Sequence, residues 1–321
     1  ISMDFVGLGA LNLDIIYKIN SDNYPPIVKK GLERRVSSGE LISLREFLEK
    51  NGKLIVKSGG GSAANTIYAL ARMGFSCGFI GKVGKDREGD FLLEDLSKVG
   101  IDTRRILREG KTGICITLVD ENGERSTLIC PGTNDNLIFN QMDVSYIEKA
   151  TFLHTSSFLG EVSFQTQKKI IKEVKNKISF DPGEPYAIKK WEILFPILKK
   201  TRIIFLTQRE IEILTGENFK KGSVKLLQLG IKIVVCKLGS KGSFIVSSDG
   251  EWFIPSIKTN PVDTTGAGDV YAAGFLAGVL TGLSLPECGK IGTKAAAISI
   301  TGFGRLNYPG KELLKEFKRG K

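Results

Sequence analysis

The amino-acid sequence predicts an α/β protein with a doubly wound, mostly parallel sheet and helices on both faces. Short apolar runs alternate with amphipathic segments between Thr151 and Leu206, a pattern typical of βαβ units. An uncharged run from Val270 to Leu280 predicts a buried helix, too short for a bilayer, which needs roughly 20 apolar residues. We expect residues 1–321 to form a single large domain.

Composition argues against several kinds of site. The five cysteines are scattered without a C-x-x-C pair, so we expect reduced core residues in place of a disulfide framework or a zinc site. The single histidine, His154, argues against His-based triads and is expected in the core or at a strand end. Acid–base work is therefore left to carboxylates.

The net charge of +11 can be interpreted in two ways. Clustered Lys and Arg would indicate a nucleic-acid-binding surface, but in this chain they are spread along the sequence. A field that attracts anionic nucleotides fits the same charge, and we expect no nucleic-acid partner. We find no signal peptide and no membrane-spanning run, so a cytoplasmic protein without a membrane partner is expected.

A strand from Asp4 to Leu11 leads into Asn12 and Asp14. If this part stays extended, the two side chains point to the same side, because side chains alternate along a strand. An ionised Asp accepts hydrogen bonds at both oxygens, which suits two neighbouring hydroxyl groups of a ligand. The alternative is an Asx turn at the strand end.

Residues 17–57 predict a helix within an otherwise irregular, basic insertion. Pro25-Pro26 interrupts regular structure, whereas Leu41, Leu44 and Leu48 follow helical spacing. The glycine-rich stretch that starts at Ser58 then opens a second helix, which we expect to end at Gly74. A flexible turn is the alternative for the glycines.

Two strand-like runs, Gly113–Val119 and Ser126–Cys130, flank a hairpin signal. The preceding Gly110-Lys111-Thr112 has the tail of a phosphate-binding loop, but Arg105 stands where its first glycine should be. We therefore expect this tripeptide to join strands of a small sheet.

Polar residues follow three later strands. Asp181 ends a strand before Pro-Gly, so it is either a ligand-facing residue or part of a turn. Thr207 and Glu210 fit a capping box, although Glu210 is also a candidate functional residue. The loop Lys237–Gly242 is either a ligand loop or a tight hairpin.

The segment Asp263–Asp269 is a loop of small residues that opens into the uncharged helix. The first N–H groups of a helix lack internal partners and carry partial positive charge, so this end can hold an anion. A carboxylate at Asp269 beside an anion suggests a base that works next to a phosphate. A helix cap made by Asp269 or Thr265 is the alternative.

This segment resembles the second signature of the PfkB (ribokinase-like) carbohydrate and nucleoside kinases. The stretch Gly60, Gly61 and Asn65 is similar to the first signature of the family, G-G-x-x-A-N. The resemblance implies that Asp269 is the catalytic base, and that Gly266, Ala267 and Gly268 form an anion hole for the transferred phosphoryl group. It also implies that Gly60, Gly61 and Asn65 line the sugar site.

Further roles follow from the same resemblance, which spans almost the whole chain. Asp14 and Asn12 are expected at the substrate. Arg125, which lies in a turn similar to the family's D-G-E-R, is expected there too, with a solvated turn as the alternative. Nucleotide binding is expected at Lys237, Gly239, Gly242 and Thr265. Glu210 is expected to support magnesium indirectly, although Thr207 replaces the family's Asn, and Asp263 is expected at a monovalent cation.

The resemblance thus implies a ribokinase-like fold with a small β-sheet lid from residues 12–58 and 104–130. The implied activity is ATP-dependent transfer of the γ-phosphoryl group to a hydroxyl of a sugar or nucleoside, with Mg²⁺ and K⁺. A kinase of a phosphorylated sugar, such as ribose 1-phosphate or a fructose phosphate, and a non-catalytic nucleotide or sugar sensor are the alternatives. A homodimer formed through an open lid edge is a further expectation.

Overall fold

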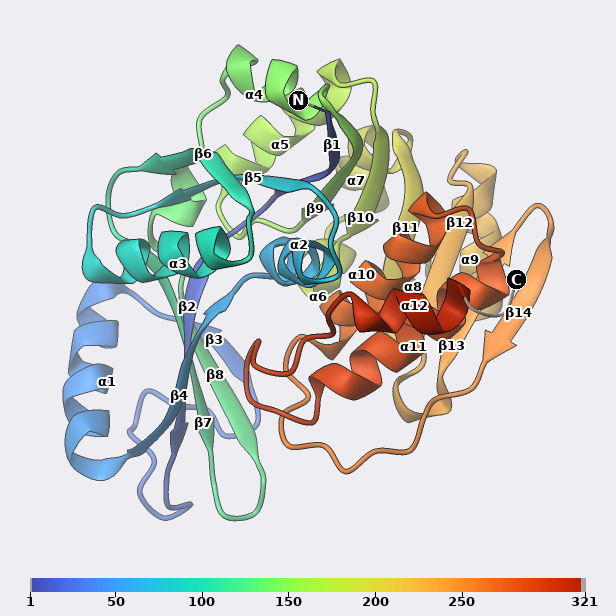
Figure 1. Cartoon of the computed structure of the whole chain (residues 1–321). Helices are drawn as coiled ribbons and strands as arrows, with labels where there is room; N and C mark the ends of the chain where they lie inside the picture. The colour runs from blue at the N-terminus through green and yellow to red at the C-terminus, as the bar shows by residue number, and fades with distance from the viewer. Residues whose placement is uncertain (1, 319–321) are drawn as a thin grey trace.

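The computed structural model describes residues 2–318 and shows a large sheet, a smaller sheet and their covering helices (Figure 1). The large sheet contains β1 (Met3–Leu8), β5 (Cys77–Val83), β6 (Asp102–Arg108), β9 (Ala150–Ser156), β10 (Lys177–Asp181), β11 (Thr201–Thr207), β12 (Ile233–Lys237), β13 (Ser243–Ser247) and β14 (Gly250–Ile254). Their order is β14-β13-β12-β11-β10-β9-β1-β5-β6. Neighbouring strands are parallel except at the β12–β13 and β13–β14 pairs. This confirms the predicted mostly parallel sheet.

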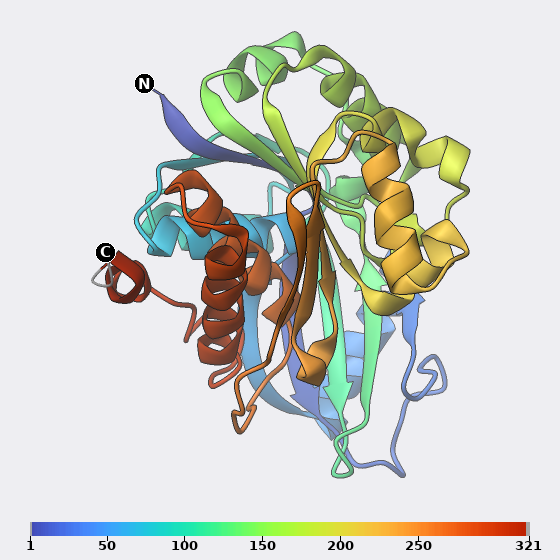
Figure 2. The same cartoon turned by 90° about the vertical axis from the view of Figure 1, so that its right-hand side faces the viewer.

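Helices cover both faces of the large sheet (Figure 2). Successive strand residues point to opposite faces, so Phe5 and Val6, both fully buried, belong to two different cores. The Phe5 core is built with α2 (Ser62–Arg72), α3 (Arg87–Lys98), α10 (Ala267–Leu280), α11 (Leu285–Ser299) and α12 (Glu312–Lys318). The Val6 core is built with α4 (Gln141–Ile147), α5 (Glu161–Glu173), α6 (Gly183–Ala187), α7 (Trp191–Leu198), α8 (Gln208–Thr215) and α9 (Phe219–Gln228). The doubly wound architecture follows from these two cores.

The smaller sheet, which we name the lid, extends from one end of the large sheet (Figure 1). Its strands are β2 (Asn12–Lys18), β3 (Glu33–Arg35), β4 (Lys53–Gly60), β7 (Gly113–Val119) and β8 (Arg125–Cys130). Their order is β3-β8-β7-β2-β4.

The second lid segment is shorter than expected. Its start was expected at residue 104, but β6 pairs in parallel with β5 in the large sheet, where Ile106 is buried in the Phe5 core. The lid part therefore begins at Gly113. Gly110-Lys111-Thr112 connects the large sheet to the lid and does not join two lid strands.

The insertion contains the expected helix, α1 (Ser38–Asn51), which covers the outer face of the lid. Leu44 and Leu48 of α1 are buried against Ile15 and Ile116 of the lid strands. Ser37 forms a capping box with Glu40, which fixes the start of α1. Since strand side chains alternate, the residues between the buried ones, Asp14 among them, face the other way.

Close helix packing explains two glycines of the uncharged helix α10. A Cβ atom at Gly274 would lie 2.9 Å from the Cα of Gly292, and one at Gly278 would lie 3.0 Å from the Cα of Cys288. Side chains there would push α11 away, so the glycines hold the two backbones together. No helix within residues 2–318 combines the length and apolar character needed to cross a bilayer.

Candidate active site

The loop before α10 turns sharply at Gly266, which has a left-handed backbone with a φ of 75°. The N–H of Thr265 donates to Asp263 Oδ1 at 3.0 Å, which ties the loop together. The N–H of Ala267 donates to the carbonyl of Thr264 at 3.2 Å. Of the three expected anion-hole residues, only Ala267 uses its N–H in these two hydrogen bonds. The N–H groups of Gly266 and Gly268 take no part in them.

Asp269 lies in the first turn of α10 and is held by α2. Ser62 Oγ donates to Asp269 Oδ1 at 2.7 Å, and Asn65 Nδ2 donates to Asp269 Oδ2 at 2.9 Å. Burial raises the pKa of Asp269 to about 6, with a further contribution from Asp181, while the two hydrogen bonds oppose the rise. Such a carboxylate is ionised at neutral pH and still basic enough to accept a proton.

Asp14 approaches Asp269 from the lid side. It lies on β2, and a Cβ atom at Gly60 of the neighbouring β4 would be 2.2 Å from Asp14 Oδ2, so the glycine makes room for the carboxylate. Burial raises the pKa of Asp14 to about 7, opposed by the positive charge of Arg305 and increased by Asp269. The two acids predicted from the sequence therefore share one electrostatic environment.

The cleft lies between the lid and the large sheet. The lid contributes Asp14, Ile16, Val56, Ser58, Gly59 and Thr117, and the rest of the chain contributes Asn65, Asp263, Thr265, Gly304 and Tyr308. Predicted residues from three distant parts of the sequence, Asp14, Asn65 and Thr265, are brought together here.

Asn12 and Gly61 stand beside the cleft and have backbone-fixing contacts. Asn134 Nδ2 donates to Asn12 Oδ1 at 3.0 Å and to the Leu11 carbonyl at 3.0 Å. Gly61 has a φ of 104°, and a Cβ atom there would lie 2.1 Å from the Ala10 carbonyl oxygen. These contacts fix the start of β2 and of α2, the elements that carry Asp14 and Asn65.

Arg125 connects the lid to the loop before α10. Its Nη2 donates to Thr265 Oγ1 at 2.7 Å and lies 3.4 Å from Asp263 Oδ1. The other oxygen of Asp263 accepts from the N–H of Gly304 at 3.2 Å. The guanidinium of Arg125 thus supplies a positive charge beside the carboxylate for which a monovalent cation is expected.

Lys237 and Asp181 form a buried ion pair on the other side of the loop. Lys237 Nζ lies 3.0 Å from Asp181 Oδ2 and would lie 3.0 Å from a Cβ atom at Gly268. Burial alone would lower the pKa of Lys237, but Asp181 and Glu210 raise it overall, so the ammonium stays charged. Asp181, at the end of β10, is therefore part of the site and not only of a turn.

Glu210 and the glycines after Lys237 have the structural roles that the sequence analysis gave as alternatives to ligand binding, a capping box and a tight hairpin. Thr207 and Glu210 form a reciprocal capping box at the start of α8, with the Thr207 N–H donating to Glu210 Oε2 at 2.8 Å. Gly239 and Gly242 have φ values of 59° and 100° in the tight connection between antiparallel β12 and β13. His154 is fully buried and hydrogen-bonded to Ser179, which confirms its place in the core.

Two residues were not predicted from the sequence: Tyr308, which lines the cleft, and Arg305, which contacts the cleft residue Asn65. Both come from the loop after α11, where Arg305 Nε donates to Asn65 Oδ1 at 3.0 Å. A Cβ atom at Gly266 would lie 2.8 Å from the Tyr308 hydroxyl, which places that hydroxyl against the loop before α10. The only sequence signal was a charged residue directly after Gly302-Phe303-Gly304.

Comparisons with known proteins identify the family of the chain. The family model described as pfkB family carbohydrate kinase matches residues 36–309. A protein of Archaeoglobus fulgidus named an uncharacterized sugar kinase is 40% identical over 239 residues, covering 73% of this chain and 95% of its own length. An ATP-dependent ribose-1-phosphate kinase of Halopiger xanaduensis is 30% identical over 264 residues, covering 81% of this chain and 86% of that protein.

Solved structures show the same fold along the whole chain. A ribokinase from Thermotoga maritima has a TM-score of 0.80 at 27% identity and covers 99% of both chains. A ribokinase from Arabidopsis thaliana, solved with ribose and ATP, has a TM-score of 0.80 at 23% identity and covers 99% of both chains. The chain therefore belongs to the pfkB family of carbohydrate kinases, with a ribokinase-like fold and phosphotransferase activity on a hydroxyl group.

Proposed function

We propose that the protein transfers the γ-phosphoryl group of ATP to a hydroxyl of a sugar or nucleoside, with Asp269 as general base. The observation that carries the proposal is the position of Asp269, in the first turn of α10 and in one buried environment with Asp14. Asp14 binds neighbouring acceptor hydroxyls, and Asp269 removes the proton from the attacking one. The amides of Gly266 and Gly268, with Ala267 shaping the turn, hold the phosphoryl oxygens.

For the nucleotide, we infer a place beside Lys237 on the side of the loop away from the lid. The Lys237 ammonium lies next to Gly268, so it is suited to a phosphate group. The turn that contains Gly239 and Gly242 borders the same region in our proposal, whereas Thr265, expected at the nucleotide, faces the lid and accepts a hydrogen bond from Arg125. Magnesium prefers oxygen ligands, and the Asp181 and Glu210 carboxylates, both near Lys237, fit that preference directly or through water. When bound, the ion neutralises charge on the phosphate oxygens.

A phosphorylated sugar is the second candidate for the acceptor. Two observations favour it: the Arg125 guanidinium at the lid edge of the cleft, which can pair with a phosphate, and the similarity to a ribose-1-phosphate kinase at 30% identity. If the acceptor carries no phosphate, Asn65 and the backbone at Gly60 and Gly61 would contact only its hydroxyl groups.

The test is a coupled ADP-release assay with ATP and magnesium, with and without potassium, on ribose, fructose, ribose 1-phosphate, adenosine, inosine and cytidine. We expect one acceptor to give turnover well above the ATPase background, and stimulation by potassium would support a cation at Asp263. Absence of turnover on every acceptor, with nucleotide binding retained in calorimetry, would contradict the kinase proposal for these acceptors and favour a sensor.

A further inference from the structure

We propose that Arg305 is a positioning residue that acts on Asp269 through the side-chain amide of Asn65. Three contacts form a continuous chain of groups. Asp95 Oδ2 accepts from Arg305 Nη1 at 2.8 Å, Asn65 Oδ1 accepts from Arg305 Nε at 3.0 Å, and Asp269 Oδ2 accepts from Asn65 Nδ2 at 2.9 Å. The inference rests on the proposed role of Asp269 as the base.

The donor and acceptor types in this chain determine the orientation of the Asn65 amide. The two ends of an amide have nearly the same size, so packing alone permits either orientation. A guanidinium can only donate hydrogen bonds, and an ionised carboxylate can only accept them. Arg305 therefore selects the oxygen end of Asn65, and the NH₂ end is left facing Asp269.

The surroundings of Arg305 hold the guanidinium in this position. The side chain is only 5% exposed and lies 4.7 Å from the ring centre of Tyr68. A Cβ atom at Gly59 would lie 2.3 Å from Arg305 Nη1, so the backbone of β4 packs directly on the guanidinium. Arg305 thus contacts the lid, α3 and α2 at once, and α2 lies between α3 and α10 (Figure 1).

Fold stability alone does not account for this arrangement. Burying a guanidinium has a desolvation penalty that its ion pair offsets only with complete hydrogen bonding. Arg305 Nη2 is buried without a hydrogen-bond partner, and Asp95 is a partly exposed partner with 22% of its side chain accessible. The pair is therefore a weak source of stability, whereas its effect on Asn65 is direct.

Loss of Arg305 should change the acid–base behaviour of Asp269. An amide that rotates freely would place its oxygen near Asp269 part of the time, removing a hydrogen bond that keeps the pKa of Asp269 from rising further. The other charged and titratable groups that face Asp269 stay in place. They are Asp181 on β10, Lys237 on β12, Asp14 on β2 and Tyr308 in the loop after α11. Asp263, in the loop before α10, stays in place too and contributes to raising the pKa of Asp14.

The test is the pH dependence of kcat at saturating acceptor, measured for the wild type and for Arg305→Leu. We expect the acidic limb of the profile to move to higher pH by about one unit, the size of one hydrogen bond to a charged group. Since Arg305 also lowers the pKa of Asp14, its loss should raise KM as well, so kcat is the quantity that reports on Asp269.

The matched control is Arg45→Leu, which removes another arginine paired with a carboxylate. Arg45 Nη1 lies 3.1 Å from Glu88 Oε1, between α1 and α3 and outside the cleft residues. Its kcat profile should match the wild type. If Arg305→Leu does not fold in a thermal-unfolding experiment, Asp95→Asn, which weakens the anchor of Arg305, should give a smaller shift in the same direction.

A double variant tests whether the effect passes through Asn65. In the Asn65→Leu background, Arg305→Leu should cause no further shift of the acidic limb. An additive shift, or an Arg305→Leu limb at the wild-type pH, would overturn the inference. Asp269→Asn measured alongside keeps the two claims separate, because retained turnover in that variant contradicts the base itself and not the role of Arg305.

Discussion

At the scale of single residues, the charge of Asp14 links acceptor binding to pH. Its pKa is raised to about 7 by burial, so acidification through neutral pH protonates it. A protonated carboxyl loses acceptor capacity for two hydroxyl groups. We therefore expect KM for the acceptor to rise as pH falls below about 7, by up to about tenfold per pH unit, while kcat changes less.

Asp14→Asn is the matched comparison for this prediction. It keeps the shape of the side chain but does not titrate, so its KM should be high and independent of pH over the same range. A wild-type KM that stays constant between about pH 6 and pH 8 would contradict the assignment of Asp14 to the acceptor.

The sequence identified the acids of the site more easily than their partners. Asp14 and Asp269 are acids within otherwise apolar or small-residue stretches, and the structure brings them close enough for Asp269 to raise the pKa of Asp14. Arg305 and Tyr308 lie in a loop without periodicity, so no local pattern indicated which way they point. Arg305 contacts Asn65, 240 positions away, and the Tyr308 hydroxyl lies against Gly266, so both placements depend on the fold.

At the scale of elements, α1 packs on the lid strands and so supports β2, the strand that carries Asp14. Leu48 is fully buried between α1 and the lid strands. We expect Leu48→Ala to lower the free energy of unfolding by about 2–5 kcal/mol, because it leaves a cavity in the small lid core. Denaturant unfolding followed by fluorescence or circular dichroism measures this change.

The control lies on the same helix. Ile42 is 59% exposed, so Ile42→Ala should change the unfolding free energy by only about 0.5 kcal/mol. Equal losses in the two variants would show that α1 is not packed on the lid as described.

The periodicity of the sequence predicted which segments are helices and which are strands, but not to which of the two sheets each strand belongs. The helix with Leu41, Leu44 and Leu48 and the strands of the βαβ region are where the pattern predicts them. The strand β6 has the same local pattern as a lid strand, and only its long-range pairing with β5 assigns it to the large sheet. Pairing between distant strands is not encoded in local spacing.

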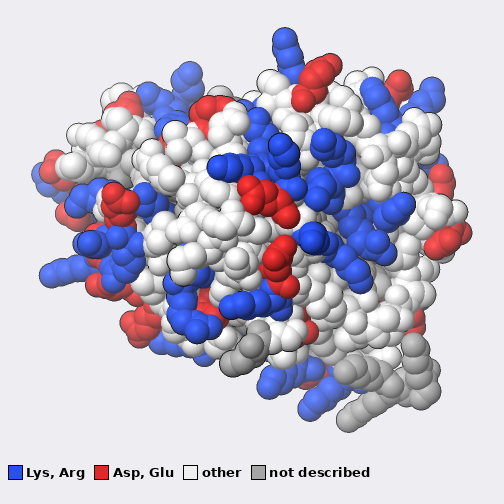
Figure 3. Space-filling view, turned by 90° about the horizontal axis from the view of Figure 1, so that it is seen from above, with Lys and Arg blue, Asp and Glu red and all other residues white. Residues whose placement is uncertain are grey.

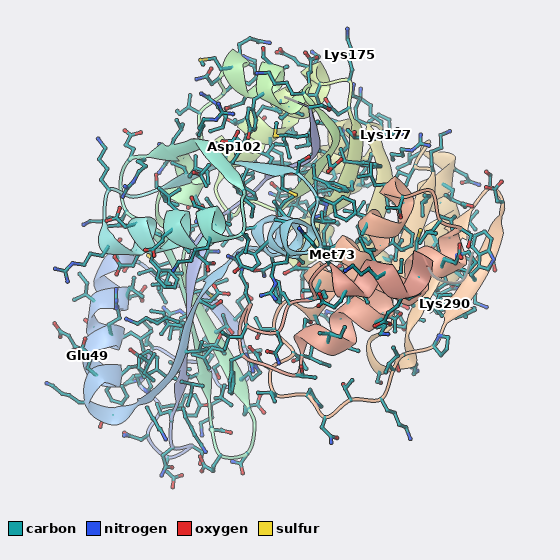
Figure 4. The ribbon with its side chains drawn as sticks, viewed as in Figure 1. Glu49, Met73, Asp102, Lys175, Lys177 and Lys290 are labelled. Atoms are coloured by element: carbon teal, nitrogen blue, oxygen red, sulfur yellow. The ribbon has the colours of Figure 1, made fainter. Side chains whose placement is uncertain are left out.

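At the scale of the whole molecule, positive side chains outnumber negative ones, with 46 Lys and Arg against 35 Asp and Glu. Figure 3 views the end opposite the lid, where Lys and Arg predominate, and Figure 4 labels Lys175 and Lys177 at that end. The cleft itself contains the carboxylates of Asp14 and Asp263, and the nearby Asp269 contributes with Asp263 to raising the pKa of Asp14. The net charge of +11 therefore does not by itself mark the site, and long-range attraction of nucleotides stays a prediction.

The lid offers less surface for a second subunit than its open edge suggested. Its outer apolar face is covered by α1 of the same chain, with Glu49 on the outer side of that helix (Figure 4). The edge strand β4 carries the exposed Lys53 and Lys57, which disfavour strand pairing. Since β3 forms the other edge of the lid sheet, the homodimer through the lid stays a prediction.

The most direct test of the account is the turnover of Asp269→Asn with the acceptor found in the ADP-release assay. The amide oxygen of this variant can still accept a hydrogen bond from Ser62, but it cannot take up the proton of the attacking hydroxyl. We expect kcat to fall by about 10²–10⁴-fold, with binding of nucleotide and acceptor retained in calorimetry. Turnover close to the wild type would contradict the assignment of Asp269 as the base.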